Sequence, residues 1–314
     1  MVDGLGEPID TSHLNKSVLN STQYSNMSQQ LVWLITGTSS GFGRDLAIAA
    51  LNRGDRVIAT ARHRSLSKLM ELKEQGADIL ELDATSPLET LHGVAKQAVA
   101  LHGRVDVLVN NAGYIEVGAL EENTPEESFN QFNTNVFGPL NVNRAFLPYM
   151  RERKSGTVVW IGSIGGWRGG AAAGLYAATK HAVRALSVSL HDEISPLGLR
   201  SICFEPGYFR TSFLTADNRG SDKSRIPDYK DTTDAAFERF NAYSLKQPGD
   251  PKKGVNVMID IIKGEGGATG REFPTVVALG SDCYEGVKAI CNKTLENLEV
   301  WKDLSTSTDF PKNT

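Results

Sequence analysis

The sequence has no uninterrupted apolar stretch of the roughly 18 to 20 residues that a membrane-spanning helix requires. Residues 1–30 are rich in Ser, Asn and Gln and lack the apolar core of a secretory signal peptide. Cysteine is scarce: the chain holds three, Cys203, Cys283 and Cys291, without the clustered spacing of a metal site. These absences argue against a disulfide-stabilised secreted module and favour a reduced, cytoplasmic setting.

The chain also lacks an excess of charge of either sign. It carries 33 Lys and Arg against 37 Asp and Glu, for a formal net charge of −4. No basic field is therefore available to attract nucleic acid or an anionic lipid surface. With 314 residues, 40% of them hydrophobic and 22% charged, the composition is that of a globular protein with a sizeable core. We expect a small-molecule partner rather than nucleic acid or a membrane.

Short runs rich in Val and Ile alternate with helical stretches along most of the chain. This alternation predicts an α/β fold, a Rossmann-like doubly wound parallel sheet covered by helices on both faces. We expect a disordered polar tail over 1–30, one domain over 31–304 and a short tail over 305–314. The predicted strands span residues 31–35, 56–60, 78–82, 105–109, 157–161, 199–204 and 275–279. The predicted helices span residues 45–53, 66–75, 87–102, about 125–153, 176–194 and 255–263.

The alternation stops after Pro206. Residues 210–250 are rich in Arg, Asp, Lys, Pro and Gly and show little strand character. We expect a long insertion over the carboxyl edge of the sheet, with few core contacts. Because low contact density means low local stability, the segment is predicted to act as a lid over the substrate.

Residues 36–43 form a glycine-rich turn, TGTSSGFG, directly after the first predicted strand. In a doubly wound sheet this turn brings backbone N–H groups to a pyrophosphate, and the N-terminus of the next helix adds a favourable partial charge. Glycine permits the tight turn, the close approach of the ligand and the close packing of the helix. The placement of Gly37, Gly41 and Gly43 therefore predicts a dinucleotide site, although a glycine triplet alone would be weak evidence.

The end of the second predicted strand reads ATARHR over residues 59–64. The usual dinucleotide fold places an acid there, which binds the ribose 2′-hydroxyl of NAD. This chain has no carboxylate in that run and has Arg62 instead, with Arg64 close behind. A guanidinium suits a 2′-phosphate, so the sequence predicts NADP(H) as the cofactor unless Arg62 is simply a solvated loop charge.

Ser163, Tyr176 and Lys180 follow a pattern of Ser, twelve residues, Tyr, three residues and Lys. Hydride transfer between an alcohol carbon and nicotinamide needs a matching proton transfer at the oxygen. The pKa of an unperturbed tyrosine is about 10, and a nearby ammonium lowers it. Tyr176 and Lys180 share a helix face at i and i+4, and Ser163 follows the fifth predicted strand, at the edge where such sheets bind ligands. We expect Tyr176 to act as acid or base, Lys180 to lower its pKa and reach a bound ribose, and Ser163 to hold the substrate oxygen.

These motifs together resemble those of the short-chain dehydrogenase/reductase family over about residues 31–280. The pattern is closest to NADP-dependent hydroxysteroid- and retinol-type reductases and fungal reductases. The resemblance implies that Asn135, in the run NVFG, is a fourth catalytic residue that helps to keep a proton-relay water. It also implies that Asp83 holds adenine, that the run NNAG at 110–113 shapes the adenine side, and that residues 206–211 border nicotinamide.

The glycine turn, the second strand end and the resemblance together define a predicted site. Its catalytic residues are Ser163, Tyr176, Lys180 and Asn135. Its cofactor-binding residues are Gly37, Ser39, Ser40, Gly41, Phe42, Gly43, Arg62, Asp83, Asn110, Ala112, Gly113, Tyr176, Lys180, Pro206, Gly207, Phe209 and Thr211. Phe42 replaces the isoleucine that is commoner in the family motif, which is a mild change.

The expected function is NADP(H)-dependent interconversion of a ketone or aldehyde and an alcohol on a small, apolar substrate. Two alternatives stay open. A sugar-nucleotide epimerase or dehydratase also uses Tyr-x-x-x-Lys, although its glycine spacing and larger C-terminal domain are not seen here. A non-catalytic NADPH-binding regulator would not need the intact Ser, Tyr and Lys. The resemblance also implies a homodimer or homotetramer.

Five aromatic residues flank the motifs, and the sequence leaves their role open. They either belong to the core or line a pocket for an apolar substrate. These residues are Tyr114, Trp167, Tyr208, Phe209 and Phe213.

Overall fold

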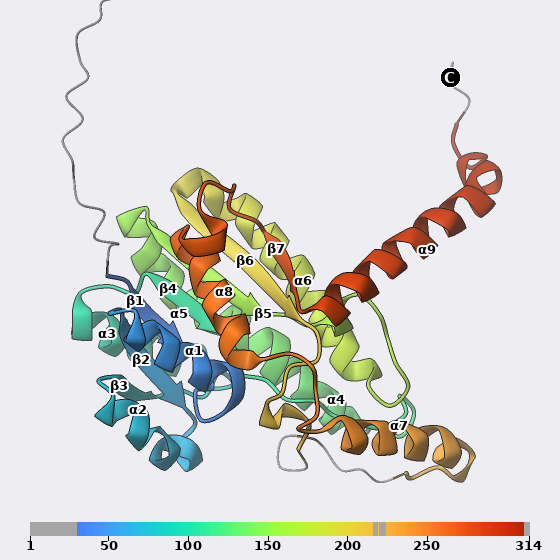
Figure 1. Ribbon diagram of the computed structural model, residues 1–314, viewed down its shortest axis with the longest axis horizontal. Coiled ribbons are helices and arrows are strands. Elements are labelled where there is room, and N and C mark those ends of the chain that lie inside the picture. Colours follow the sequence, from blue (N-terminus) through green and yellow to red (C-terminus); the bar gives the residue numbers. More distant parts are fainter. Residues whose placement is uncertain (1–29, 216–218, 220–223, 311–314) are drawn as a thin grey trace, which may run out of the picture.

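A parallel sheet forms the centre of the computed structural model, which describes residues 30–215, 219 and 224–310 (Figure 1). Within these residues the sheet has seven strands in the order β3-β2-β1-β4-β5-β6-β7, and every neighbouring pair is parallel. The strands are β1 (Val32–Ile35), β2 (Arg56–Ala61), β3 (Asp78–Glu81), β4 (Val107–Asn110), β5 (Gly156–Ile161), β6 (Leu199–Pro206) and β7 (Val276–Leu279). The predicted Rossmann-like fold is therefore confirmed. The predicted tail over 1–30 lies outside the described residues except for Gln30, whereas residues 305–310 of the predicted tail over 305–314 are described.

Helices connect the strands as the alternation predicted. They are α1 (Gly41–Asn52), α2 (Met70–Glu74), α3 (Leu88–His102), α4 (Pro125–Phe132), α5 (Gly138–Arg153), α6 (Gly174–Ile194), α7 (Lys230–Tyr243), α8 (Pro251–Lys263) and α9 (Ser281–Thr306). Helix α1 begins at the glycine turn itself, four residues before the predicted start at 45. The predicted helix over 125–153 is divided by a π-helical turn at Asn133–Phe137, which separates α4 from α5. This turn positions a predicted catalytic residue, described below.

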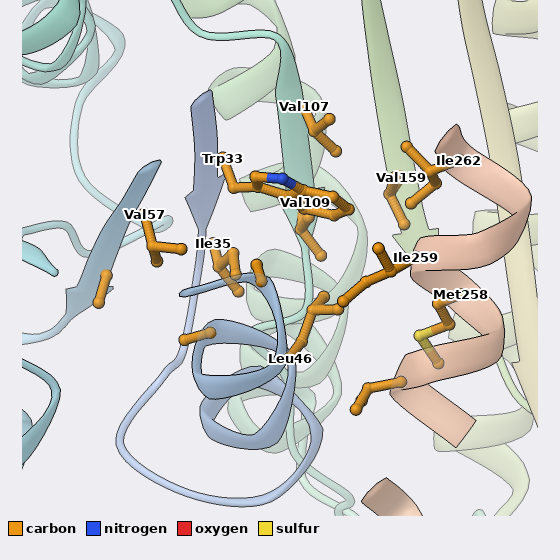
Figure 2. Packing of buried hydrophobic residues seen from close by; sticks show 14 of the residues in the cluster. Trp33, Ile35, Leu46, Val57, Val107, Val109, Val159, Met258, Ile259 and Ile262 are labelled. Atoms are coloured by element: carbon orange, nitrogen blue, oxygen red, sulfur yellow. The ribbon is translucent and has the colours of Figure 1, made fainter. Parts of the chain in front are cut away.

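Burial on both faces explains why the strands read as continuous apolar runs. In β1, Trp33 and Ile35 pack on one face of the sheet while Val32 and Leu34 pack on the other, because side chains alternate along a strand. Residues from α1, α2 and α8 cover the first face, and residues from α3, α5 and α6 cover the second. Figure 2 shows the first face, where Trp33 lies beside side chains of α8. The two layers of helices leave the carboxyl ends of the strands open.

Helix α7 occupies the segment that was expected to make few core contacts, and this expectation is wrong. Ala236 and Phe237 of α7 are buried in a small apolar cluster with Ile115, Val117 and Ala172. Because most residues of the segment are polar, its composition did not indicate this short apolar face. The helix lies over the carboxyl edge of the sheet, as predicted for the insertion, and it contributes to the cavity described below.

The chain before α7 is tied to the start of α4. The Arg225 guanidinium donates to both carboxylate oxygens of Glu127, at 2.7 and 2.5 Å. Glu122 Oε1 accepts hydrogen bonds from the backbone N–H groups of Arg225 and Ile226, at 2.7 and 2.9 Å. The hydrogen bonds from Arg225 lower the pKa of Glu127 to about 2. The segment is therefore anchored at this end by an ionised pair.

Helix α9 is a second helix that the sequence did not predict. Its first turn is packed, because Cys283 is buried and its thiol donates a hydrogen bond to the Glu205 carbonyl at 3.2 Å. From residue 292 to 306 every position is exposed, and Figure 1 shows the helix leaving the domain. The helix continues to Thr306, two residues past the predicted domain boundary at 304, which stays a prediction. None of the helices in the described residues is both long and apolar enough to cross a membrane.

Candidate active site

The carboxyl ends of the strands open into a large cavity. The strand order reverses between β1 and β4, and sheets of this kind bind ligands at such a reversal. The cavity has a volume of about 820 Å³ and is lined by the glycine turn, the ends of β2, β3, β5 and β6, and parts of α6 and α7. The predicted site residues that line it are Gly37, Ser39, Ser40, Gly41, Phe42, Arg62, Asp83, Ala112, Gly113, Ser163, Tyr176, Lys180, Pro206, Gly207, Phe209 and Thr211. Gly43, Asn110 and Asn135 do not line it.

The glycine turn has a conformation that requires glycine at two positions. Gly37 has a φ of 71° and Gly41 a φ of 59°, in the left-handed region that side chains disfavour. A Cβ on Gly37 would also lie 2.9 Å from Ala112 Cα. At Gly43 close packing requires glycine instead, because a Cβ added there would lie 2.6 Å from the Gly37 carbonyl oxygen. The turn can therefore lie close to both a ligand and the first helix.

Helix α1 presents an uncapped N-terminus to the cavity. Ser40 occupies the N-cap position, and its side chain makes no capping hydrogen bond. Ser39, Ser40, Gly41 and Phe42 line the cavity at this point. The first N–H groups of a helix lack intrahelical partners, so they are available to a pyrophosphate, whose charge the helix dipole favours.

The two asparagines at the end of β4 differ from the prediction. Asn111, rather than Asn110, lines the cavity, and its amide donates to the carbonyl oxygens of Thr36 (2.8 Å) and Gly37 (3.1 Å). Asn110 is buried, and its amide donates to Asn143 Oδ1 in α5 at 2.8 Å. Asn111 therefore holds the glycine turn, and Asn110 fixes the sheet to α5. Adjacent side chains in an extended chain point to opposite sides, so just one of the pair can reach the cavity.

Arg62 and Asp83 line the cavity beyond the glycine turn. Arg62 follows β2, its side chain is exposed, and no carboxylate among the described residues forms a salt bridge with it. Asp83 follows β3, and its Oδ1 accepts hydrogen bonds from the backbone N–H and the hydroxyl of Thr85, at 3.0 and 2.7 Å. This leaves Asp83 Oδ2 and the Arg62 guanidinium available to a ligand.

Ser163, Tyr176 and Lys180 meet in the wall of the cavity. Ser163 follows β5, and its hydroxyl oxygen accepts a hydrogen bond from the Gly165 N–H at 3.0 Å. Tyr176 lies in the first turn of α6, and a Cβ built on Gly165 would lie 3.4 Å from both Ser163 Oγ and Tyr176 Cε1. Lys180 Nζ donates to the Ile161 carbonyl at 2.6 Å and lies 5.5 Å from the centre of the Tyr176 ring. The spacing in the sequence therefore does bring the three groups together.

Burial dominates the electrostatics of this group. Burial raises the pKa of Tyr176 to about 12, and the hydrogen bond with Ser163 opposes the rise. Burial lowers the pKa of Lys180 to about 8. The expectation that Lys180 lowers the pKa of the phenol is not met, because burial raises this pKa and the ammonium lies against the ring and donates to the Ile161 carbonyl. At neutral pH Tyr176 is thus a protonated phenol.

Asn135 lies in the π-helical turn, outside the cavity lining. Its Oδ1 accepts a hydrogen bond from the Tyr114 N–H at 3.2 Å, and its Nδ2 donates to the Tyr114 carbonyl and to Thr179 Oγ1, at 2.9 and 3.2 Å. The Thr179 hydroxyl donates in turn to the Tyr176 carbonyl at 2.7 Å. These hydrogen bonds tie the turn to the part of α6 that carries Tyr176. The predicted part of Asn135 in a proton relay stays a prediction.

Most of the aromatic residues near the motifs line the cavity, namely Tyr114, Tyr208, Phe209 and Phe213. The Phe209 ring lies 5.0 Å from the Phe42 ring, which connects the segment after β6 to the glycine turn. Phe42, which replaces isoleucine, therefore packs against an aromatic partner in the cavity wall.

Trp167 belongs instead to a polar cluster beside the cavity. Its indole N–H donates to Glu205 Oε2 at 2.6 Å, and the Arg184 guanidinium lies 3.5 Å from the centre of its ring. Arg184 also pairs with Glu205 at 3.4 Å. The Glu205 side chain is 1% exposed, and burial raises the pKa of its carboxyl. The cluster joins the loop after Ser163, helix α6 and the end of β6.

Replacing Trp167 by Phe should destabilise the fold, because it leaves a buried Glu205 oxygen without its hydrogen-bond donor. We expect a loss of about 1–3 kcal/mol in the free energy of unfolding, the range for an unsatisfied buried polar group. Urea unfolding measures this loss. The matched control is Trp301→Phe in the exposed part of α9, which should change the free energy by less than about 0.5 kcal/mol. Equal effects of the two substitutions would contradict a structural role for the cluster.

Comparison with known proteins identifies the family. The family model for short chain dehydrogenases matches residues 31–222. The chain is also similar to oxidoreductase BOA17 of Botryotinia fuckeliana (strain B05.10), with 32% identity over 276 residues. This match covers 87% of this chain and 97% of the relative.

Solved structures support the same family assignment. A short-chain dehydrogenase from Streptomyces avermitilis matches with a TM-score of 0.79 and 38% identity, over 90% of this chain and 100% of that one. Actinorhodin polyketide ketoreductase, solved with NADPH, matches with a TM-score of 0.66 and 28% identity, over 81% of this chain and 97% of that one. Another structure with this fold holds NAD. With the parallel sheet, the glycine turn and the Ser163, Tyr176 and Lys180 group, these matches establish that the chain belongs to the short-chain dehydrogenase/reductase family of oxidoreductases.

Proposed function

We propose that the protein interconverts a ketone or aldehyde and the corresponding alcohol with NADP(H) as its cofactor. One observation carries this proposal: a single cavity contains both the glycine turn with Arg62 and the group formed by Ser163, Tyr176 and Lys180. The cavity thus combines a place for a dinucleotide with a proton donor for a substrate oxygen. Titration with NADPH, followed by a turnover screen of carbonyl compounds, tests the proposal.

The residues of the cavity fit NADP(H). The left-handed glycines keep side chains out of the turn, and the uncapped N-terminus of α1 offers N–H groups to a pyrophosphate. Arg62, which forms no salt bridge with any described carboxylate, offers its guanidinium at the strand end where an acid would select NAD. The match to a ketoreductase solved with NADPH supports this choice. When bound, NADPH supplies the hydride that reduces a carbonyl carbon.

The chain's own residues act on the substrate oxygen and its proton. Ser163 Oγ accepts a hydrogen bond from Gly165 and keeps one hydroxyl proton, which it shares with the Tyr176 oxygen and can donate to a substrate carbonyl oxygen. Tyr176 donates its phenol proton to that oxygen during reduction and takes it back during oxidation. Lys180, held by the Ile161 carbonyl, stabilises the phenolate that proton transfer leaves and binds the ribose. Asn135 acts through its hydrogen bonds to position this group.

The substrate part of the cavity is apolar. The Phe213 ring lies 5.7 Å from the Tyr176 ring, and Ile164, Leu214 and Phe240 line the same cavity. A pocket wall of this kind buries an apolar substrate body while a few polar groups fix its orientation. We therefore propose a substrate with an apolar body around its carbonyl group.

The two alternative functions predict different results in the same assays. A regulator would bind NADPH without turning over any carbonyl compound. An epimerase or dehydratase would convert a sugar nucleotide without net consumption of NADPH. After β6 the described residues form α7, α8, β7 and α9 and no separate substrate domain, which favours the reductase.

The pH dependence of the reaction should reflect the pKa values of Tyr176 and Lys180. The Tyr176 phenol, with a pKa of about 12, stays protonated throughout, whereas Lys180 loses its proton as the pH rises through about 8. We expect kcat/KM for reduction to be level from about pH 6 to 7.5 and to fall above about pH 8, because this parameter reports the free enzyme. Oxidation should become faster with rising pH, since it needs the phenolate. Loss of the reduction rate between about pH 5 and 7 would instead point to a carboxyl or imidazole acid.

We also expect α7 to become more protected when the site fills. Its residues Arg239, Phe240 and Tyr243 line the cavity, so a bound substrate adds contacts to the helix. Amide hydrogen exchange of α7 should slow when NADP⁺ and a substrate-like ketone are added together. Helix α3, which does not line the cavity, is the internal control. Identical exchange of α7 in the two states would show that it is a fixed wall rather than a lid.

A further inference from the structure

The lining of the cavity carries more positive charge than the protein as a whole. Four of its side chains are cationic, Arg62, Arg168, Lys180 and Arg239, and among the described residues that line it Asp83 alone is acidic. The whole chain, in contrast, has a formal net charge of −4. A cleft lined by one sign of charge, with low-dielectric walls, concentrates ligands of the opposite sign.

Two of these cations have a part in the proposed function, and two do not. Arg62 suits the cofactor phosphate, and Lys180 serves the phenol and the ribose. Arg168 lies in the loop between Ser163 and α6, and Arg239 lies on α7 next to Phe240. Both arginines therefore come from segments that surround the reacting group, not from the glycine turn or the ends of β2 and β3.

The segments that carry the two arginines are fixed by the fold. Arg168 follows Trp167, whose indole is held by Glu205 and Arg184. Arg239 follows the buried pair at 236–237, and its Nε donates to the Ala235 carbonyl at 3.3 Å.

Among the described residues, no carboxylate neutralises either charge. Across the described part of the chain, no carboxylate forms a salt bridge with Arg168 or Arg239, and both side chains are exposed. A guanidinium offers several N–H donors and keeps its charge at every relevant pH. Two such groups at the rim of an apolar cavity suit a ligand whose apolar body ends in an anionic group.

We propose that the substrate is an amphipathic carbonyl compound that carries an anionic group, such as a carboxylate, which Arg168 and Arg239 bind. The apolar body lies among Ile164, Phe213 and Phe240, with the carbonyl oxygen at Ser163 and Tyr176. This inference rests on the proposed function and adds the charge class of its substrate. It predicts that negative charge on a substrate raises kcat/KM and that positive charge lowers it.

A matched set of ketones tests the inference. The three probes share one apolar ketone and end in a carboxylate, a neutral amide or an ammonium group. At low salt we expect kcat/KM for the carboxylate to exceed that for the amide about tenfold, with the ammonium probe slowest, and the difference to shrink in about 0.5 M salt. Equal values for the three probes, or a preference for the ammonium, would overturn the inference.

The variants Arg168→Gln and Arg239→Gln test which arginine causes the preference for the carboxylate probe. At least one of them should reduce the ratio of carboxylate to amide kcat/KM by about three- to thirtyfold, the range between an exposed ion pair and a charge-assisted hydrogen bond. Arg151→Gln, on an exposed residue outside the cavity, is the matched control and should keep the ratio. An unchanged ratio in both cavity variants overturns the inference. So does a tenfold loss of NADPH affinity in them, which would assign these arginines to the cofactor.

Binding separates this inference from the proposed function. Calorimetry with the NADP⁺-loaded protein ranks the three probes without any turnover. If the carboxylate probe binds best but no probe is reduced, the charge preference stands and the proposed reaction is wrong. If the amide and carboxylate probes are reduced and bound equally well, the reaction stands and the charge preference is wrong.

Discussion

Replacement of Tyr176 by Phe should lower the turnover of carbonyl compounds by about 10² or more, the range for loss of a general acid. The substitution keeps the aromatic ring in its partly buried place beside Phe213 and removes the proton that the substrate oxygen needs. Steady-state consumption of NADPH measures the loss. Fluorescence titration should show that NADPH still binds, and urea unfolding should show a folded protein.

Tyr284→Phe provides the matched control, since this tyrosine lies exposed on α9. It should turn over substrate like the unmodified protein. Unchanged turnover in Tyr176→Phe would remove this residue from the mechanism and would favour a regulator that binds NADPH without chemistry.

Replacement of Arg62 by Asp should change the cofactor preference. It removes the guanidinium that we assign to the 2′-phosphate and places a carboxylate where an NAD-selective fold has one. Loss of a charge-assisted hydrogen bond costs about 1.5–3 kcal/mol, so the dissociation constant for NADPH should rise about 10- to 150-fold. The dissociation constant for NADH should change far less.

Arg64→Asp tests whether NADPH binding depends on the position of Arg62 or only on the positive charge of this segment. Arg64 is exposed, two residues further along, and does not line the cavity. This variant should weaken NADPH binding no more than a general change in surface charge does. An unmodified protein that prefers NADH, or equal effects of the two substitutions, would contradict the assignment of Arg62.

Local patterns predicted the sheet and most of the site. The Tyr176 and Lys180 spacing fixes their shared helix face, and the order of the strands fixes where Ser163 lies, so these residues could be placed together from the sequence. The choice between Asn110 and Asn111 could not be made, because it depends on which side of the chain faces the cavity after β4 ends. That orientation comes from packing against α5.

The remaining differences arise from tertiary contacts. Helix α7 carries a short apolar face in a polar segment, and its burial depends on a cluster built by residues more than 60 positions away. The raised pKa of Tyr176 depends on burial, which the spacing between Tyr176 and Lys180 does not reveal. Arg168 and Arg239 carry no motif, and the fold alone brings both to one cavity.

Transfer of deuterium tests the central assignment most directly. The protein is incubated with NADPH that carries deuterium at both C4 positions of the nicotinamide and with an apolar ketone that carries a carboxylate, and the product is analysed by mass spectrometry. We predict an alcohol with deuterium on the former carbonyl carbon, formed by the unmodified protein and formed about 10² times more slowly, or slower still, by Tyr176→Phe. Binding of the deuterated NADPH without any labelled alcohol, across a panel of ketones and aldehydes, would contradict the assignment of this protein as an NADP(H)-dependent carbonyl reductase.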